Sequence, residues 1–351
     1  MTLFKIHPKI NIALFTVLHF IVDGICGLVI FSSLILNQSD DMSFAILITY
    51  NLLAFVTQPF VGLLIDIRDN QERLFLLISV FSLALGICFK SQPLISAVFL
   101  GIGNSFFHIS GGKYTIRKTG NDIFDLGLFV STGAVGLAIG CNFNNVYVWS
   151  IFVSLLFLIS FLIIFSKDSK NITSDKNICK NEKLSKKAIF LLFLLICIAV
   201  LIRSFIGKIV NYSFDKTALI LVLFGLDSTL GKALGGAISK AIGINKTIII
   251  TMIASTILFI FSNDNVYLSL LAILFFNMSM PLTLYLANCL VEKEGFAFGM
   301  LAAFLIPGYL LGMFSMSETL IKILIATSSL ITAAIVVIAN SVIKSKRKSV
   351  L

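Results

Sequence analysis

Long apolar runs follow one another along most of this chain. Each contains roughly 18 to 25 residues, the length that an α-helix needs to cross the hydrocarbon core of a bilayer. Hydrophobic residues fill 58% of the 351 positions and charged residues only 13%, whereas a typical soluble domain has about 25% charged residues. The sequence therefore predicts an all-α polytopic membrane protein.

The apolar runs predict about 12 transmembrane helices in two sets of six. The first set covers residues 10–36, 43–65, 74–89, 94–112, 123–141 and 146–165. The second covers residues 188–210, 217–242, 247–261, 266–290, 296–314 and 320–339. Between them lies a polar segment with seven lysines, residues 166–187, which predicts a mobile cytoplasmic linker. The expected domains are an N-terminal bundle (1–165), this linker (166–187) and a C-terminal bundle with a basic tail (188–351).

Basic residues gather at the N-terminus, in alternate loops and in the tail, where Lys344, Lys346, Arg347 and Lys348 follow the last apolar run. This distribution follows the positive-inside rule. It predicts a multi-pass protein of the cell membrane with both termini in the cytoplasm. The net charge of +10 is then explained by topology in a lipid bilayer, so we expect no nucleic-acid partner. We expect the protein to be a monomer.

The sequence contains no recognisable catalytic or metal-binding motif. The six cysteines have no CxxC spacing and the three histidines are widely spread, so we expect no metal and no cofactor. The stretch from Gly225 to Lys232 resembles a phosphate-binding loop, but it has five intervening residues before Gly231 and lies in an apolar run. No serine or cysteine lies in a nucleophile motif. We therefore do not expect an enzyme.

A pattern of glycines repeats in the two halves. Gly127, Gly136 and Gly140 of the fifth predicted helix align with Gly299, Gly308 and Gly312 of the eleventh. The last two glycines of each set are four residues apart and so share one helix face, where small residues allow close packing of helices in a membrane. Asn104 aligns with Asn277 at a similar offset, and the loop after the second helix aligns with the loop after the eighth. Two related bundles of six helices are typical of secondary transporters whose binding site lies at the bilayer midplane, between the halves.

Two ionisable residues share one face of the first predicted helix near mid-membrane, His19 and Asp23. A charged side chain in hydrocarbon costs about 2.5 to 3.5 kcal/mol on insertion scales, so its retention needs a reason. One interpretation is that His19 is a neutral imidazole bonded to a backbone carbonyl. The other, which we favour because Asp23 is one turn away, is a pair that takes up and releases protons.

The second half also contains buried charge. Arg203 cannot deprotonate in a protein, so in hydrocarbon it must pair with a carboxylate or with an anionic substrate. Asp227 is the expected carboxylate partner, and both alternatives stay open. Lys232 is five residues beyond Asp227, on a different part of the helix surface, and we expect it to extend towards the cytoplasmic end.

Polar residues concentrate in the first, fourth, seventh, eighth and tenth predicted helices, whereas the third, sixth and ninth have no ionisable group in mid-span. This division predicts that every third helix faces lipid and that the others enclose a cavity. The candidate residues for that cavity are Asn104, His108, Arg203, Asp227 and Asn277. His108 has a structural and a functional interpretation of nearly equal weight.

Several segments resemble the major facilitator superfamily. Gly62-LLI-Asp66-I-Arg68 is similar to the loop that follows the second helix in that superfamily, and Gly133-AV-Gly136-LAI-Gly140 is similar to its glycine-rich fifth helix. A closer resemblance is to the fosmidomycin-resistance-like branch, through His19-FIV-Asp23, Gln58-PFV-Gly62 and Gly101-IGNSFF-His108. It covers about residues 15 to 140, and Ile109 and Ser110 stand where that branch tends to have proline and glutamate.

The resemblance implies a two-bundle carrier that alternates between inward-open and outward-open states. It implies that His19, Asp23, Asn104 and His108 line the N-terminal side of the cavity, and that Arg203, Asp227 and Asn277 line the C-terminal side. It further implies that Gly62, Asp66 and Arg68 latch a cytoplasmic gate. Close contacts between the halves would then come from the glycines of the fifth and eleventh helices, Gly133, Gly136, Gly140, Gly308 and Gly312.

The favoured hypothesis is a secondary active transporter that exports a small, anionic or amphiphilic molecule by proton-coupled antiport. Import of a small anionic solute by the same fold is the alternative, because direction is not encoded in these motifs. A membrane sensor or scaffold without transport activity is a third hypothesis, which predicts that the polar residues pair fully with one another and leave no cavity.

Overall fold

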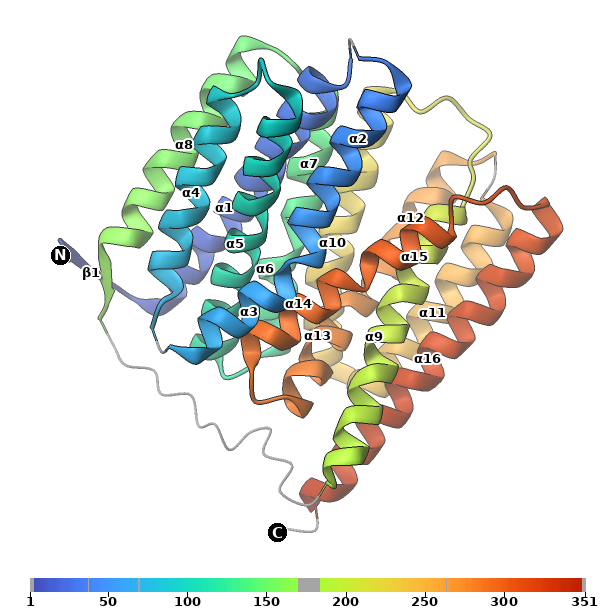
Figure 1. Ribbon diagram of the computed structural model, residues 1–351. Coiled ribbons are helices and arrows are strands. Elements are labelled where there is room, and N and C mark those ends of the chain that lie inside the picture. The colour runs from blue at the N-terminus through green and yellow to red at the C-terminus, as the bar shows by residue number, and fades with distance from the viewer. Residues whose placement is uncertain (1–2, 37, 69, 170–183, 263, 349–351) are drawn as a thin grey trace.

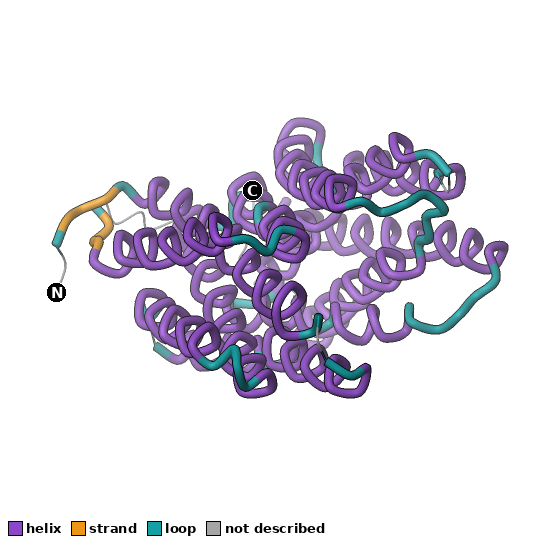
Figure 2. The backbone as a smooth tube through the Cα atoms, turned by 90° about the horizontal axis from the view of Figure 1, so that it is seen from above, coloured by secondary structure: helices purple, strands orange, loops and turns teal. Residues whose placement is uncertain are grey.

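The computed structural model describes residues 3–36, 38–68, 70–169, 184–262 and 264–348, and they are almost entirely helical (Figures 1 and 2). The N-terminal half contains β1 (Phe4–Ile6), α1 (Pro8–Val29), η1 (Ile30–Leu34), α2 (Asp40–Asn51), η2 (Leu52–Val56), α3 (Gln58–Ile67), α4 (Glu72–Cys88), α5 (Pro93–Thr119), α6 (Ile123–Ser131), α7 (Gly133–Asn142), α8 (Val146–Phe165) and β2 (Ser166–Asp168). The C-terminal half contains α9 (Lys186–Ile209), α10 (Ala218–Ile242), α11 (Ile244–Phe261), α12 (Val266–Asn277), α13 (Ser279–Leu290), α14 (Glu294–Ala303), α15 (Leu305–Leu311) and α16 (Glu318–Lys348).

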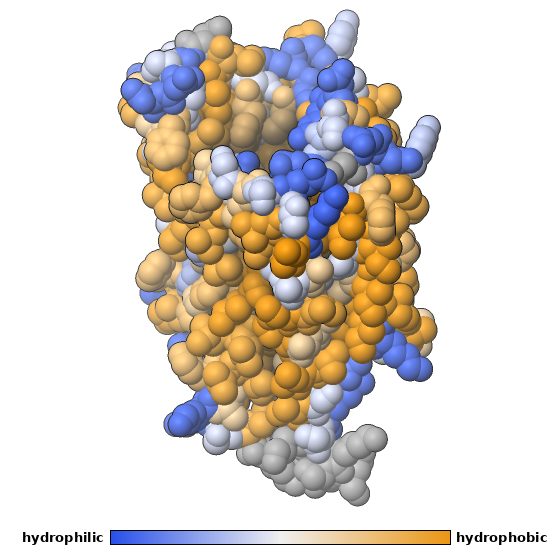
Figure 3. All heavy atoms as spheres, turned by 90° about the vertical axis from the view of Figure 1, so that its right-hand side faces the viewer, coloured by the Kyte–Doolittle hydropathy of each residue, from blue (hydrophilic) through white to orange (hydrophobic). Residues whose placement is uncertain are grey.

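These segments form twelve helical spans in two bundles. Within the described ranges, 11 spans are long and apolar enough to cross a membrane, and the 17-residue helix α4 supplies the remaining one. On the face formed by the C-terminal half, apolar side chains make a broad belt and polar side chains gather towards its ends (Figure 3). The prediction of an all-α polytopic fold with two six-helix bundles is confirmed.

Four of the spans are interrupted near mid-depth, and three of the breaks follow from proline. Pro59, Pro281 and Pro307 each lack the amide hydrogen and crowd the carbonyl four residues before them, which disrupts a continuous α-helix. The chain responds with the π-helical segment η2 before Pro59, a break at Met278 before Pro281, and a break at Phe304 before Pro307. The fifth span breaks at Thr132 without a proline, where the Thr132 hydroxyl donates to the carbonyl oxygen of Thr16 (2.5 Å).

The repeated glycines have equivalent surroundings in the two halves. A side chain at Gly136 would meet the Phe20 carbonyl of α1, and one at Gly308 would meet the Leu201 carbonyl of α9. These positions let the fifth and eleventh spans approach the first span of their own half closely.

The prediction that the five glycines of the two repeated helices join the halves is therefore wrong. Gly133 and Gly140 also pack on α1, and Gly312 packs on Lys208 of α9. The four-residue spacing correctly indicated close packing, but it could not indicate which neighbouring helix would be the partner.

Other glycines do lie between the halves. Gly127 of α6 approaches the Lys232 carbonyl of α10, and Gly299 of α14 approaches the backbone of Gln58 in α3. The halves therefore meet through two equivalent contacts, the fifth span against the eighth and the eleventh against the second. The two glycines in these contacts, Gly127 and Gly299, are equivalent positions of the sequence repeat.

Helix α5 is longer than the sequence indicates. It was expected to end near Gly112, before a basic loop, but it continues to Thr119 and ends at Gly120, which has a left-handed conformation (φ 65°). The extra turns are buried because Lys113 forms an ion pair with Asp66 (2.9 Å). A charged residue such as Lys113 need not end a helix when its side chain forms an ion pair with a neighbouring helix.

The first residues after α8 are a strand, which differs from the predicted linker. Ser166–Asp168 (β2) pairs in parallel with Phe4–Ile6 (β1). The carboxylate of Asp168 accepts hydrogen bonds or ion pairs from Asn11, Arg73, Tyr114 and Lys118, at 2.7 to 3.1 Å. These contacts fix the start of the linker to α1, α4 and α5. Residues 170–183 of the predicted linker lie outside the described residues.

Candidate functional site

Two histidines converge on one carboxylate in the N-terminal half. His19 Nε2 lies 3.2 Å from Asp23 Oδ2, and His108 Nε2 of α5 lies 3.0 Å from Asp23 Oδ1. Asn104, one turn before His108, also donates from Nδ2 to Asp23 Oδ1 (3.0 Å). We call His19, Asp23 and His108 the proton unit.

The hydrogen bonds of His19 fix where its protons lie. Its Nδ1 is 2.7 Å from the carbonyl oxygen of Phe129, and because a carbonyl only accepts, Nδ1 must carry a hydrogen. Nε2 then faces Asp23 Oδ2 at 3.2 Å, a distance at which a proton placed between them would form a hydrogen bond. The sequence left two interpretations of His19 open, a hydrogen bond to a backbone carbonyl and a proton-transferring pair with Asp23. The structure contains the carbonyl hydrogen bond and also places Asp23 beside Nε2.

The proton unit opens onto a cavity of about 160 Å³ between the two halves. Ten of its sixteen lining residues are apolar, among them Phe55, Val130, Met280 and Phe298. The lining comes from both bundles, and it includes residues next to the breaks at Phe304 and Met278. The interrupted helices thus surround the cavity.

Two cations from the C-terminal half face the same cavity, Arg203 of α9 and Lys232 of α10. Arg203 is only 8% exposed, and its Nη1 has no hydrogen-bond partner among the described residues. Lys232 was expected to extend towards the cytoplasmic end, but its side chain lines the cavity instead. The preceding residue, Gly231, packs on α12.

Three of the predicted cavity residues lie elsewhere. Asn104 stands behind Asp23, Asn277 bonds to Ser228 (3.3 Å) and to the Ile273 carbonyl (2.9 Å), and neither is among the lining residues. Asp227 also lies outside the lining, and the described part of the chain contains no ion pair between it and Arg203. The expected pairing of Arg203 with Asp227 is therefore not formed. Lys232 is five positions after Asp227, which turns the helix far enough that only Lys232 of the two faces the cavity.

The halves also make polar contacts at the end of the bundle where Asp66 lies. Both oxygens of Asp66 accept from backbone amides at the start of α14, from Gly295 (3.1 Å) and Phe296 (2.8 Å). A carboxylate is favoured at a helix N-terminus by its free amides and its dipole. Lys240 of α10 pairs with Asp122, the residue before α6, at 2.6 Å.

Of the predicted gate residues, Gly62 and Asp66 occupy this interface, since a side chain at Gly62 would meet the backbone of Gly295. Arg68 is exposed at the end of α3. The buried cation beside Asp66 is instead Lys113, which sequence reasoning missed because it follows a Gly-Gly pair and starts a basic stretch. The sequence repeat did indicate that α14 packs closely on another helix, because Gly299 of α14 aligns with Gly127 of the fifth predicted helix.

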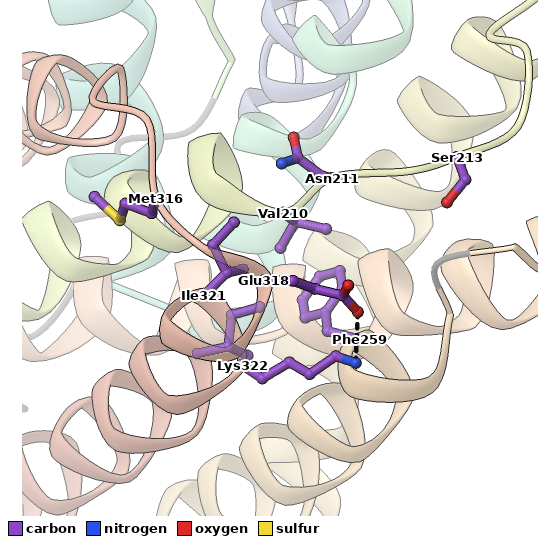
Figure 4. A pocket seen from close by; sticks show the side chains of 9 residues that line it. Val210, Asn211, Ser213, Phe259, Met316, Glu318, Ile321 and Lys322 are labelled. Atoms are coloured by element: carbon purple, nitrogen blue, oxygen red, sulfur yellow. Dashed lines mark ion pairs between the residues drawn. The ribbon is translucent and has the colours of Figure 1, made fainter.

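A second cavity of about 280 Å³ lies in the C-terminal half, near the start of α16 (Figure 4). Figure 4 shows the Glu318–Lys322 ion pair (2.7 Å) at its edge, with Asn211 and Ser213 on the segment that follows α9. Both charged side chains are well exposed and pair with each other. This cavity is separate from the proton unit.

No model of a protein family matches the sequence, and no curated protein sequence matches it. Solved structures do match. A single-residue variant of the E. coli fucose:proton symporter FucP has a TM-score of 0.68 at 15% identity, and the match covers 95% of this chain and 99% of FucP. FucP, a major facilitator superfamily transporter in the outward conformation, has a TM-score of 0.69 at 15% identity, with 95% and 98% covered. The chain therefore has the fold of major facilitator superfamily transporters.

Proposed function

We propose that this protein is a secondary active transporter, not an enzyme, which moves a small molecule across the membrane by alternating access and couples that movement to protons. The observation that carries the proposal is the proton unit on the wall of a cavity between two bundles. A sensor or scaffold is less well supported, because it requires fully paired polar residues, whereas Arg203 Nη1 has no partner among the described residues and a cavity is present.

The contacts of Asp66 with α14 and the Asp122–Lys240 ion pair support an assignment of the conformational state in the transport cycle. With the termini in the cytoplasm, as the basic loops suggest, the end closed by Asp66 and by the Asp122–Lys240 pair is the cytoplasmic end. A cavity closed at that end is sealed from the cytoplasm, which supports our proposal of an outward-facing or occluded state. Transport requires these contacts to break while the proton unit and the substrate bias the equilibrium between states.

The sequence resemblance to the fosmidomycin-resistance-like branch favours efflux, and import remains the alternative. Both directions use the same proton unit. In efflux an entering proton replaces the substrate, and in import both enter together. Arg203 and Lys232 favour an anion as the substrate in either case. We also propose that the protein is a monomer in the cell membrane.

Asp23→Asn tests the proposal. Removing the carboxylate removes the group that holds the transferable proton between the histidines, so solute movement driven by a pH gradient should be abolished in proteoliposomes. Exchange of solute across the membrane without a gradient should persist. The matched control is Asp41→Asn, an exposed carboxylate in the first turn of α2. Gradient-driven transport at the wild-type rate in Asp23→Asn would contradict the proposal.

A further inference from the structure

The charges around the central cavity do not balance. Of the described residues that line it, Asp23 is the one carboxylate, whereas Arg203 and Lys232 are both cations. With Asp23 ionised and the histidines neutral, the formal charge is +1. A proton added between His19 and Asp23 raises it to +2. A buried net charge of this size is costly unless a counter-ion is present.

Arg203 also has a donor without an acceptor among the described residues. Arg203 is more than nine-tenths buried, and Nη1 finds no acceptor among the described residues. An unmade hydrogen bond on a buried charged group is expensive, and guanidinium binds planar carboxylate, sulfonate and phosphonate groups well. The acceptor that is missing from the described part of the protein is the one an anionic solute would supply.

The rest of the cavity selects for an apolar body. Its lining includes Phe55, Val200, Phe298 and Leu301, and Thr283 is the one uncharged polar side chain, apart from the histidines, among the described lining residues. A polyhydroxylated solute would lose hydrogen bonds to water there and regain few of them. A solute with one anionic group and an apolar remainder fits both parts of the wall.

We infer that the substrate is a small amphiphilic organic anion, held by Arg203 and Lys232, and that it binds together with the proton on the His19–Asp23 pair. The inference rests on the proposed function, whose cavity and proton unit it uses. Binding of the proton alone or of the anion alone changes the net charge of the cavity by one unit. Binding of both leaves it unchanged, so each increases the affinity for the other.

This sign of coupling favours cotransport over exchange. A proton that strengthens binding of the anion travels with it, whereas an exporter of the same anion needs the proton to expel it. The other ionisable groups near Asp23 do not reverse the sign: His108 bonds to the same carboxylate, and Cys26 and Tyr50 are neutral at physiological pH. Movement of one proton with one monovalent anion carries no net charge.

Benzenesulfonate is a suitable probe because it stays ionised throughout the physiological pH range, so a proton bound with it must reside on the protein. We expect the purified full-length protein to take up protons from a weakly buffered solution when benzenesulfonate binds. Benzyl alcohol, a neutral molecule with the same ring, should bind at least about tenfold more weakly, the effect expected when a charge-assisted hydrogen bond is not made. Uptake into proteoliposomes should follow the pH gradient and be insensitive to a potassium diffusion potential.

Variants separate the two parts of the inference. Arg203→Gln and Lys232→Gln should each weaken benzenesulfonate binding by about tenfold or more, the effect expected for loss of a charge-assisted hydrogen bond. Lys208→Gln is the matched control, because Lys208 is on the same helix as Arg203 but lies over the ring of Tyr309 (5.0 Å). Asp23→Asn should retain binding and lose the proton uptake.

Release of protons on binding would overturn cotransport and favour exchange. Equal affinity for benzyl alcohol, or full binding in Arg203→Gln, would overturn the anionic class of substrate. Either result leaves a proton-coupled carrier intact. The proposed function itself fails if anionic, neutral and cationic solutes all cross the membrane without proton movement, or if none crosses at all.

Discussion

Gly133 touches the proton unit directly. A side chain at this position would overlap Asp23 Oδ2 and His19 Nε2, and the glycine lies beside the break at Thr132 in the fifth span. The absence of a Cβ therefore allows α7 to pack directly against the His19–Asp23 pair.

Gly133→Ala should abolish proton-coupled transport and lower the melting temperature, because the methyl group must displace the His19–Asp23 pair. Gly207→Ala is the control: a side chain there would meet nothing within 4 Å, and alanine is preferred over glycine in a helix by about 1 kcal/mol. Scanning fluorimetry and a pH-driven transport assay would measure both effects. Equal behaviour of the two variants would show that Gly133 does not position the pair.

The sequence revealed the chemistry of the site better than its geometry. The four-residue spacing of His19 and Asp23 placed them on one helix face, and the contact follows from helical geometry. Arg203 was identified because an arginine in an apolar run needs a partner. That His108 shares the same carboxylate depends on how α5 packs against α1, and no local pattern encodes that packing.

At the scale of elements, Asp168 links the small sheet to the N-terminal bundle. Burial raises the pKa of the Asp168 carboxyl, but hydrogen bonds from Lys118 and Tyr114 and the charges of Lys118 and Arg73 outweigh it, so the pKa is lowered below the usual value of an aspartate. A carboxyl whose pKa falls on folding stabilises the folded state at a pH above its unfolded pKa, about 3.9. That stabilisation is lost as the pH falls through the lower pKa of the folded state.

Asp168→Asn should therefore destabilise the protein near neutral pH by about 1 to 3 kcal/mol, the range for loss of hydrogen bonds to a charged group. The gap in melting temperature between wild type and variant should narrow as the pH falls below about 4. Asp215→Asn, at an exposed loop position, should show no such dependence. A gap that stays constant down to acid pH would mean that Asp168 acts through packing alone.

The ends of a helix could be predicted where the composition of the sequence changes sharply. They could not be predicted where packing against other helices determines them. Runs without charge predicted α8 and α11 to within a few residues, because nothing interrupts them. The mid-depth breaks before Pro281 and Pro307 were not anticipated, since proline in a membrane helix is tolerated when neighbouring helices satisfy the freed backbone groups. The sequence did not reveal β2 because its partner strand β1 lies at the opposite end of the N-terminal half, so no local sequence pattern links the two strands.

At the scale of the whole molecule, the closed end is held by contacts between elements of opposite halves. The Asp122–Lys240 ion pair (2.6 Å) joins the start of α6 to the last turns of α10. Because bundles of this kind rock as nearly rigid bodies, a covalent link at this point should prevent the inward-open state.

In a cysteine-free background, Asp122→Cys with Lys240→Cys should lose transport when treated with a short reducible bifunctional crosslinker. Transport should return after reduction. The control pair is Glu318→Cys with Lys322→Cys, which are equally close (2.7 Å) but lie on the same helix, so its crosslink should leave transport unchanged. Full transport by the crosslinked Asp122–Lys240 variant would show that this end need not open.

The strand pair sets an order of events during synthesis. Phe4–Ile6 leaves the ribosome early, but its partner, Ser166–Asp168, is made only after all six spans of the first bundle. The small sheet can thus form only on a finished bundle, and it ties β1 to the point where the second bundle is about to be made. A nascent chain that stops before Asp168 cannot complete this strand pair, and the backbone hydrogen-bonding groups of its first strand stay unpaired.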